Sequence, residues 1–390
     1  MSGPRPLPPS VLDARQAALT VLRHNAHGPY DRLPRTAGWG YPEPYTRDLL
    51  ISGLGILASG DRPLRATLLR VMATLARNQS PRGHIPSLVH DPEDRGASDT
   101  TPLFLLLAGI LRRSLGRPGY LATPVRKALR WMEYQTTDDR VMVAQQPTSD
   151  WRDEHWVLGH GLFVNALVHG YLLALDDPDR ARDLRGAVNG SDQPSESSSQ
   201  VEGLAIRGRP TYAMWSYKVL RDERCDLLGN SLAILTGLAS PTRAGHMVTW
   251  IEAQCAELRA AGELALDLPP CFFPYARPSD PDWQPRYALY NQPGDYHNGG
   301  VWPFVCGFYV AALVAAGRQR LAETRLLALT ELVRPAREAA VTHGFNEWIK
   351  AQDGVASGQD WQTWSASMYL YAAACVEQGR ALYLGDQQHG

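Results

Sequence analysis

Two kinds of helical segment alternate along this 390-residue chain. The first kind is apolar on nearly every face. It comprises segments 49–58, 103–111, 162–175, 227–239, 304–316 and 365–375. A helix that is apolar all round, yet too short to cross a bilayer, has to be buried between other helices. These segments are therefore predicted to be the inner helices of the fold.

The second kind of segment is amphipathic. In 61–78, Leu64, Leu68 and Met72 fall on one stripe, whereas Arg65 and Arg70 lie off it. The remaining amphipathic segments are 11–24, 121–135, 241–261 and 318–333, with a weaker one at 178–188. They are predicted to be surface helices, one for each inner helix.

The spacing of the inner segments predicts the architecture. They begin near residues 48, 101, 161, 228, 302 and 365, so a helix-pair unit recurs along the whole chain. We expect an all-α fold, an (α/α)6 barrel with six inner and six outer helices. An open solenoid is the alternative, but it does not need fully apolar inner helices. The barrel is predicted to be a single catalytic domain over 1–390, with the Ser/Gly/Pro-rich stretch 189–211 as a flexible surface loop or lid.

The composition limits the kinds of partner that the protein can bind. The chain has 39 Lys+Arg against 40 Asp+Glu, a net charge of −1, which gives no electrostatic footprint for nucleic acid or an anionic membrane. No apolar run reaches the roughly 20 residues of a membrane span, and the first residues lack a secretory apolar stretch. The five cysteines are spread out and form no CxxC, so we expect a cytoplasmic protein without disulfides. The near absence of lysine suggests a GC-rich bacterial genome.

Polar and aromatic residues gather just before each inner segment, in stretches 38–48, 98–104, 149–156, 222–230, 296–303 and 360–364. If the helix N-termini converge, these stretches form one pocket. Seven of the eleven tryptophans lie in or beside such stretches. Aromatic faces with a few fixed polar groups suit a sugar. The alternative is that the tryptophans only fill the wide end of the barrel.

Carboxylates in these stretches could cleave a glycosidic bond, which needs two of them. The candidates are Asp48, Asp99, Asp150, Asp153, Glu154, Asp226, Glu347 and Asp360. Asp48 and Asp99 could instead cap the helices that follow them. Glu347 lies between Phe345 and Trp348, whose apolar surroundings should raise its pKa, although a loop glutamate is often simply solvated.

Other chemistries lack a signal in the sequence. There is no GxSxG, P-loop, HExxH or suitably placed GxGxxG. His155 and His160 are five residues apart, which does not place two metal ligands on one helix face. We therefore predict no metal and no cofactor.

Several stretches resemble a known group of enzymes. They are YTRDLLISGLGIL (45–57), SDTTPLFLLLAGIL (98–111), DWRDEHWVLGHGLFVNALVHGYLLAL (150–175), LLGNSLAILTGLA (227–239), HNGGVWPFVCGFYVAALVAAGR (297–318) and GFNEWIKAQDGVASGQDWQTWSASMYLYA (344–372). Together they resemble the (α/α)6-barrel glycoside hydrolases that include the neutral/alkaline invertases. Glucosylglycerate and mannosylglycerate hydrolases and amylo-α-1,6-glucosidase-like enzymes are similar. The resemblance covers about residues 38–378.

The resemblance implies roles for individual residues. Glu347 would be the general base and Asp153 the general acid, with Asp150 as the fallback acid. Substrate-binding residues would be Tyr45, Arg47, Asp48, Asp99, Asp150, Trp151, His297, Asn298, Trp302, Trp348, Gln362 and Trp364.

The implied reaction is the inverting hydrolysis of a small α-glycoside (a glucoside, mannoside or sucrose-like sugar) by an exo-acting enzyme. Inversion requires carboxyl groups roughly 6.5–9.5 Å apart. Asp153 would need a raised pKa and should be the less solvated of the two acids. Three alternatives stay open. A sugar epimerase or isomerase would use His160, His297 or His343. A non-catalytic carbohydrate-binding protein is the second, and a phosphorylase is the third and weakest.

Overall fold

The computed structural model describes residues 5–136, 141–190, 203–338 and 341–384. Within these residues the predicted inner helices are confirmed. Their bounds are α2 (Thr46–Ser59), α4 (Thr100–Leu115), α6 (Leu162–Ala174), α8 (Leu227–Leu235), α11 (Pro303–Ala315) and α13 (Thr363–Gln378). Nearly every residue of α6 and α11 is buried, as their all-round apolar sequences require. Helix α8 ends earlier than predicted, where the Ala239 N–H donates to the Ala233 carbonyl at 2.8 Å.

The predicted surface helices are also present. They are α1 (Pro9–Asn25), α3 (Arg62–Asn78), α5 (Ala122–Glu133), α7 (Pro178–Asn189), α9 (Pro241–Ala260) and α12 (Gln319–Leu332). Each buries one stripe and exposes the rest. In α3, Leu64, Leu68 and Met72 are buried, which confirms the predicted stripe. Caps from Asp61, Asp177 and Ser240 start α3, α7 and α9.

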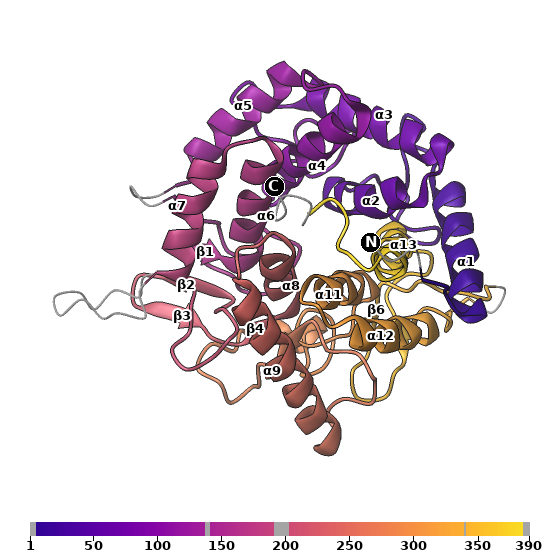
Figure 1. The fold of residues 1–390 in the computed structure, drawn as a ribbon, viewed down its shortest axis with the longest axis vertical. Helices are drawn as coiled ribbons and strands as arrows, with labels where there is room; N and C mark the ends of the chain where they lie inside the picture. Colours follow the sequence, from indigo (N-terminus) through magenta and orange to yellow (C-terminus); the bar gives the residue numbers. More distant parts are fainter. Residues whose placement is uncertain (1–4, 137–140, 191–202, 339–340, 385–390) are drawn as a thin grey trace.

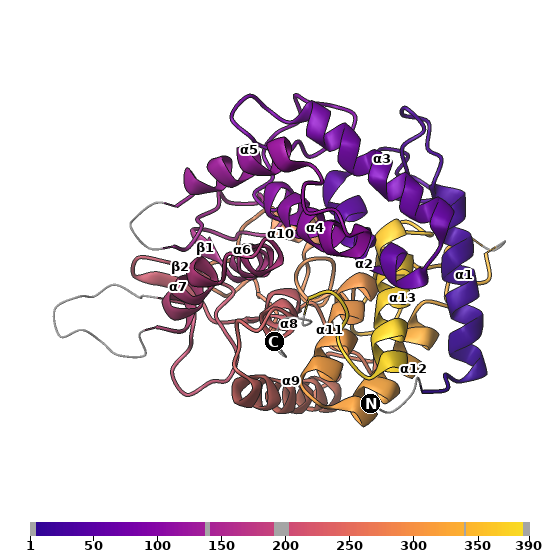
Figure 2. The ribbon, with the colours of Figure 1, turned by 45° about the horizontal axis from the view of Figure 1, so that its top comes forward.

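The inner helices are arranged as a closed ring. Each one contacts the next along the chain, and α13 also contacts α2. The surface helices lie outside this ring, each beside an inner neighbour (Figure 1), and the turned view gives the same arrangement (Figure 2). The ring closes most tightly at α13. A Cβ on Gly55 would lie 1.8 Å from the Ser367 carbonyl oxygen, so only glycine allows this approach of α2.

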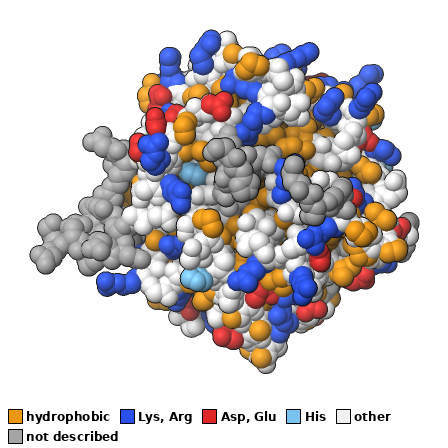
Figure 3. All heavy atoms as spheres, in the orientation of Figure 1, with side chains coloured by type: hydrophobic (Ala, Val, Ile, Leu, Met, Phe, Trp, Pro, Cys, Tyr) orange, Lys and Arg blue, Asp and Glu red, His pale blue; other side chains and the backbone are white. Residues whose placement is uncertain are grey.

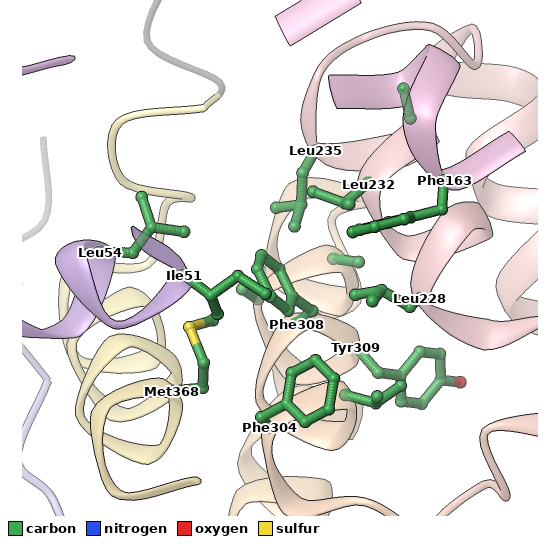
Figure 4. Packing of buried hydrophobic residues seen from close by; sticks show 14 of the residues in the cluster. Ile51, Leu54, Phe163, Leu228, Leu232, Leu235, Phe304, Phe308, Tyr309 and Met368 are labelled. Carbon is green, nitrogen blue, oxygen red and sulfur yellow. The ribbon is translucent and has the colours of Figure 1, made fainter. Parts of the chain in front are cut away.

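Side chains from different inner helices share one apolar interior. Ile51 of α2, Met368 of α13, Phe304 and Phe308 of α11, and Phe163 of α6 point into it (Figure 4). This interior forms the main core of the described residues.

Short strands in the loops were not predicted. Strands β1 (His160–Gly161), β2 (Trp215–Tyr217) and β3 (Leu220–Asp222) form an antiparallel sheet in the order β1-β2-β3, with Gly161 opposite Trp215 and Trp215 opposite Asp222. Strand β4 (Cys225–Asp226) pairs with β5 (Phe272–Phe273), and β6 (Trp348–Ile349) with β7 (Ala356–Ser357). One more short helix, α10 (Tyr287–Tyr290), lies in the 274–296 loop. These pairings fix the loops at the N-terminal ends of the inner helices.

The charged side chains of the surface agree with the balanced composition of the sequence. In the view of Figure 3, basic side chains are spread around the face with acidic ones among them. In the part of the chain that the structure describes, no helix is both long and apolar enough to cross a membrane. All five cysteines are buried. Most of the predicted loop 189–211 lies outside the described residues, because these resume only at Gly203.

Candidate active site

A pocket lies on the face where α2, α11 and α13 begin, and four of the six stretches predicted to form it contribute lining residues, whereas 98–104 and 222–230 do not. Its volume is about 130 Å³, and it brings together residues from both ends of the chain. The predicted site residues that line it are Tyr45, Arg47, Asp48, Trp151, Asp153, His297, Trp302, Glu347, Gln362 and Trp364. Both carboxylates assigned to catalysis are among them.

Arg47 and Asp99 form a buried ion pair at the edge of the pocket. The Arg47 Nε donates to Asp99 Oδ2 at 2.5 Å, and Asp99 is fully buried. Burial raises the pKa of Asp99, and Arg47 only partly offsets this. Asp99 stands at the N-cap of α4, but its side chain makes no capping bond. Asp99 is not among the residues that line the pocket. Its role is to hold Arg47, which lines the pocket.

Asp48 is the third residue of α2 and not its N-cap, which is Tyr45. The capping role considered for Asp48 is therefore wrong. Its side chain lines the pocket and is buried. Burial raises its pKa to about 8, partly offset by Arg47, and the charges of Glu347 and Asp153 raise it further. Near pH 7 Asp48 is therefore mostly a neutral acid that can donate a hydrogen bond.

Asp150, the fallback acid, lies behind the pocket wall. Arg152 is fully buried between two carboxylates, with Nη2 3.2 Å from Asp150 Oδ2 and Nη1 2.8 Å from Asp226 Oδ1. Burial alone would raise the pKa of Asp150. The charge of Arg152 and the hydrogen bonds that Asp150 accepts outweigh this effect and hold the pKa of Asp150 below its usual value. Asp150 thus stays ionised and anchors its segment to the start of α8.

Asp153 follows this anchored segment and faces the open pocket, where its side chain is exposed. The surrounding protein still desolvates its carboxyl group and raises its pKa to about 6. Arg47 opposes this rise, whereas Glu154, Asp150 and Asp99 add to it. A carboxyl group in this range can hold a proton close to neutral pH.

Glu347 also lines the pocket and is only 7% exposed. Its Oε2 accepts the Gln359 N–H at 3.1 Å, and its own N–H donates to the Gln359 carbonyl at 3.0 Å. Burial raises its pKa to about 7; the Gln359 bond lowers it and the charge of Asp153 raises it. The predicted rise in the pKa of Glu347 is confirmed, and Phe345, two residues before it, is fully buried.

One expectation about the pair is wrong. Asp153 was predicted to be the less solvated acid, but Glu347 is the buried one. The physical reason is local: Asp153 stands in a turn beside the pocket opening, whereas Glu347 is folded under the Gln359 backbone. With pKa values of about 6 and 7, the two groups together hold one proton near neutral pH.

Aromatic rings form the remaining wall. Tyr296, His297 and Trp302 form a three-ring cluster in which His297 stacks on Tyr296 (centroids 3.9 Å apart) and on Trp302 (5.4 Å), and Trp364 stacks on Phe304 at 4.0 Å. Burial holds the pKa of His297 well below its usual value, so the ring is neutral. Buried polar atoms of pocket residues lack a hydrogen-bond partner in the described part of the chain: Trp151 Nε1, His297 Nδ1, Gln362 Oε1 and Trp364 Nε1. They leave hydrogen-bonding capacity at the pocket wall.

Two more predicted residues lie away from the pocket. Asn298 is fully buried and holds the loop together: its Nδ2 donates to the Ala276 and Asn291 carbonyls, and its Oδ1 accepts the Ala276 N–H at 2.7 Å. Trp348 lines a neighbouring cavity of about 520 Å³ that shares Tyr41, Tyr296 and Glu347 with the pocket. Trp348 thus lies beside the pocket, in a cavity that adjoins it.

Three pocket residues were missed. Thr36, Tyr41 and Tyr296 line the pocket. Burial raises the pKa of Tyr41 to about 12, and Glu347 and Asp153 add to the rise, so its hydroxyl stays protonated beside both acids. Tyr41 and Tyr296 lie in the aromatic stretches before α2 and α11, but nothing in the sequence separated them from their aromatic neighbours. Of the histidines considered for proton abstraction, only His297 lines the pocket.

Asp360 and Asp226, two further candidates, have structural roles. Asp360 accepts the Glu338 N–H at 2.7 Å and a bond from the Asn346 amide, which steadies the turn before Glu347. Glu154 pairs with Arg286 outside the pocket.

No group of three or more His, Cys, Asp or Glu within the described ranges could hold a metal ion.

Comparison with protein families gives a partial match. Residues 219–379 match the family described as alkaline and neutral invertase. This confirms the resemblance for the part of the chain that carries His297, Trp302, Glu347, Gln362 and Trp364. Arg47, Asp48 and Asp153 lie outside the matched range.

Curated relatives match over a similar length. The chain is 32% identical over 165 residues to the probable alkaline/neutral invertase F of Arabidopsis thaliana, covering 40% of this chain and 30% of that protein. It is 30% identical over 165 residues to cytosolic invertase 1 of Oryza sativa subsp. japonica, covering 40% and 26%. The chain thus spans less than a third of the length of these relatives.

Solved structures match over nearly the whole chain. A GH63 mannosylglycerate hydrolase from Thermus thermophilus, in complex with Tris and D-glycerate, aligns with a TM-score of 0.67 at 15% identity, covering 92% of this chain and 99% of that one. A wild-type glycosidase aligns with a TM-score of 0.61 at 17% identity, covering 94% and 97%. At this identity the likeness establishes a shared helical fold.

Proposed function

We propose that the protein is a glycoside hydrolase that cleaves a small α-glycoside with inversion, using Asp153 as general acid and Glu347 as general base. The observation that carries the proposal is the meeting of these two carboxyl groups, both with raised pKa values, in one aromatic-walled pocket. The ring of inner helices supports an (α/α)6 barrel forming one domain. The invertase match at Glu347 supports the reaction class.

In this mechanism Asp153 protonates the glycosidic oxygen while Glu347 takes a proton from the water that attacks the anomeric carbon. The reaction needs the single proton of the pair to be on Asp153 when substrate is bound. Without substrate, the pKa values of about 6 for Asp153 and about 7 for Glu347 place this proton on Glu347, so the active form is the one with the proton moved to Asp153. The Gln359 N–H assists this form because it favours the ionised state of Glu347.

The ligand is proposed to be an uncharged sugar ring held by the pocket walls. Arg47 and Gln362 can bind hydroxyl groups, and Asp48 can donate to one in its neutral form. Trp302, Trp364 and His297 form the aromatic part of the lining, against which the apolar side of the ring can pack. The enzyme is proposed to act in the cytoplasm, which agrees with cysteines that are buried and widely spread along the chain.

Glu347→Gln tests the proposal. Wild type and variant are incubated with sucrose, trehalose, maltose, isomaltose, glucosylglycerate and mannosylglycerate, and the anomeric protons are followed by NMR. We expect wild type to release a sugar of inverted configuration and the variant to be slower by ~10²–10⁴-fold, because general-base catalysis has this size. Retained configuration would refute the mechanism. Interconversion of sugars without hydrolysis would identify an epimerase instead.

A further inference from the structure

A second and larger hollow lies away from the pocket. It is a groove of about 940 Å³ between α9, strand β3 and the 274–284 loop. The segment 153–156 separates the two: Asp153 lines the pocket, Glu154 pairs with Arg286 between them, and Trp156 lines the groove. None of the residues assigned to the reaction lines this groove.

Three indole rings from different elements line the groove. Trp156 comes from the loop after Asp153 and is 42% exposed. Trp250 comes from α9 and is fixed by stacking on Phe273, with centroids 6.0 Å apart and planes 18° apart. Trp215 of β2 is largely buried, and its indole N–H has no hydrogen-bond partner among the described residues. Indole faces that are held in place bind the apolar faces of sugar rings.

The charged groups of the groove are balanced and rigid. Its lining has three arginines (Arg209, Arg221, Arg224) and three acids (Asp222, Glu223, Asp282). Arg224 is largely buried and binds Asp222 at 3.0 Å and Asp280 at 2.9 Å as well as Asp282. Arg221 pairs with Glu223 at 2.5 Å. Because these charges already neutralise one another, the groove has little attraction for a charged ligand, but its fixed donors and acceptors can bind hydroxyl groups.

We propose that this groove is a second carbohydrate-binding site, for an uncharged oligosaccharide of two or three sugar units. The volume is within the range of sites that enclose small ligands, and it is much larger than the pocket. The combination of indole faces with a neutral, preformed polar floor is what such a ligand needs. The site does not depend on hydrolysis by Asp153 and Glu347, so it can be tested separately from the proposed function.

The test measures binding in Glu347→Gln, so that hydrolysis does not remove the ligand. Maltotriose, isomaltotriose, cellotriose, mannotriose and 1-kestose are titrated by calorimetry and by saturation-transfer NMR, with sialyllactose as the charged comparison. We expect at least one neutral trisaccharide to bind at a site that Trp156→Ala weakens about tenfold or more, which is within the range of one lost aromatic contact. Tyr134→Ala, which removes an exposed ring at the end of α5, should have no effect.

Trp250→Ala provides a second variant, with its melting temperature measured because Trp250 packs on Phe273. The proposal is overturned if neither Trp156→Ala nor a folded Trp250→Ala weakens the binding of any neutral trisaccharide. It is also overturned if sialyllactose binds best.

The exposed Leu220 beside the groove could instead meet a second copy of the chain. An oligomer that both Leu220→Arg and Trp156→Ala dissociate, seen by sedimentation, would replace the sugar site with that interface.

Discussion

The two walls of the pocket are built in different ways. The charged wall, from the first half of the chain, holds Arg47 and Asp153 together with the neutral acid Asp48 and the rings of Tyr41, Tyr45 and Trp151. Buried ion pairs to Asp99 and among Asp150, Arg152 and Asp226 support it. The wall from the second half is aromatic and holds one acid, Glu347, with backbone hydrogen bonds. Only the second wall lies in the range that matches the invertase family.

This difference between the walls suggests that one binds the ligand and the other positions the general base. A charged wall can fix the hydroxyl groups of a ring, and its buried ion pairs are sensitive to the loss of either partner. An aromatic wall with a backbone-held glutamate can keep the base in place while it titrates near neutral pH. Substitutions on the first wall should therefore affect stability and binding, whereas those around Glu347 should affect turnover.

The largest expected effect is that of Asp153→Asn on catalysis. We expect kcat/KM to fall by ~10²–10⁴-fold on a glycoside with a sugar leaving group, because proton donation is lost. With a glycosyl fluoride, whose leaving group needs little protonation, the loss should be much smaller. Asp150→Asn provides the comparison: its residue lies behind the wall, so its effect should be the same on both substrates. Equal losses on both substrates for Asp153→Asn would contradict its role as acid.

Arg47→Met should have the largest effect on stability. It leaves the buried carboxylate of Asp99 unpaired, so the free energy of unfolding should fall by about 3–5 kcal/mol in urea. Arg182→Met breaks an exposed ion pair with Asp179 on α7 and should cost less than about 1 kcal/mol. Similar losses in the two variants would show that the Asp99 pair does not support the charged wall.

A smaller effect is expected for Gly358→Ala. A Cβ at this position would lie 2.3 Å from Oε2 of Glu347, and the residue has a left-handed φ of +71°. We expect kcat/KM to fall about tenfold or more, because small displacements of a catalytic group are costly. Gly354→Ala is the matched control: its φ is +73°, but the contact its Cβ would make is at 3.5 Å with Leu266. Both should lose similar stability, and only Gly358→Ala should lose turnover.

The sequence was sufficient to predict the helices and much of the pocket, for physical reasons. Segments such as 162–175 and 304–316 are apolar on every face, so they could only be inner helices, and residues just before them had to meet where those helices begin. Side-chain partners could not be predicted in this way. These partners depend on contacts between loops that are distant in the sequence. Examples are the bond from Arg47 to Asp99, the bonds between Asn298 and Ala276, and the position of Tyr41 beside both acids.

The pH dependence of kcat/KM should show the smallest changes. The reaction needs one proton on the pair, so activity should be highest between about pH 6 and 7 and fall about tenfold per pH unit outside this range. In Asp153→Asn, assayed with the glycosyl fluoride, the alkaline decline near pH 7 should disappear because Asp153 no longer loses a proton, and only Asp48, whose pKa is about 8, can lower the activity at higher pH. The acid limb should move to higher pH: in wild type it follows the first proton lost from the pair, near pH 6, whereas in the variant it follows Glu347 alone, whose pKa of about 7 is only partly lowered by the loss of the Asp153 charge. An acid limb that stays in place, or an alkaline decline that persists near pH 7, would show that the two groups do not share a proton across the pocket.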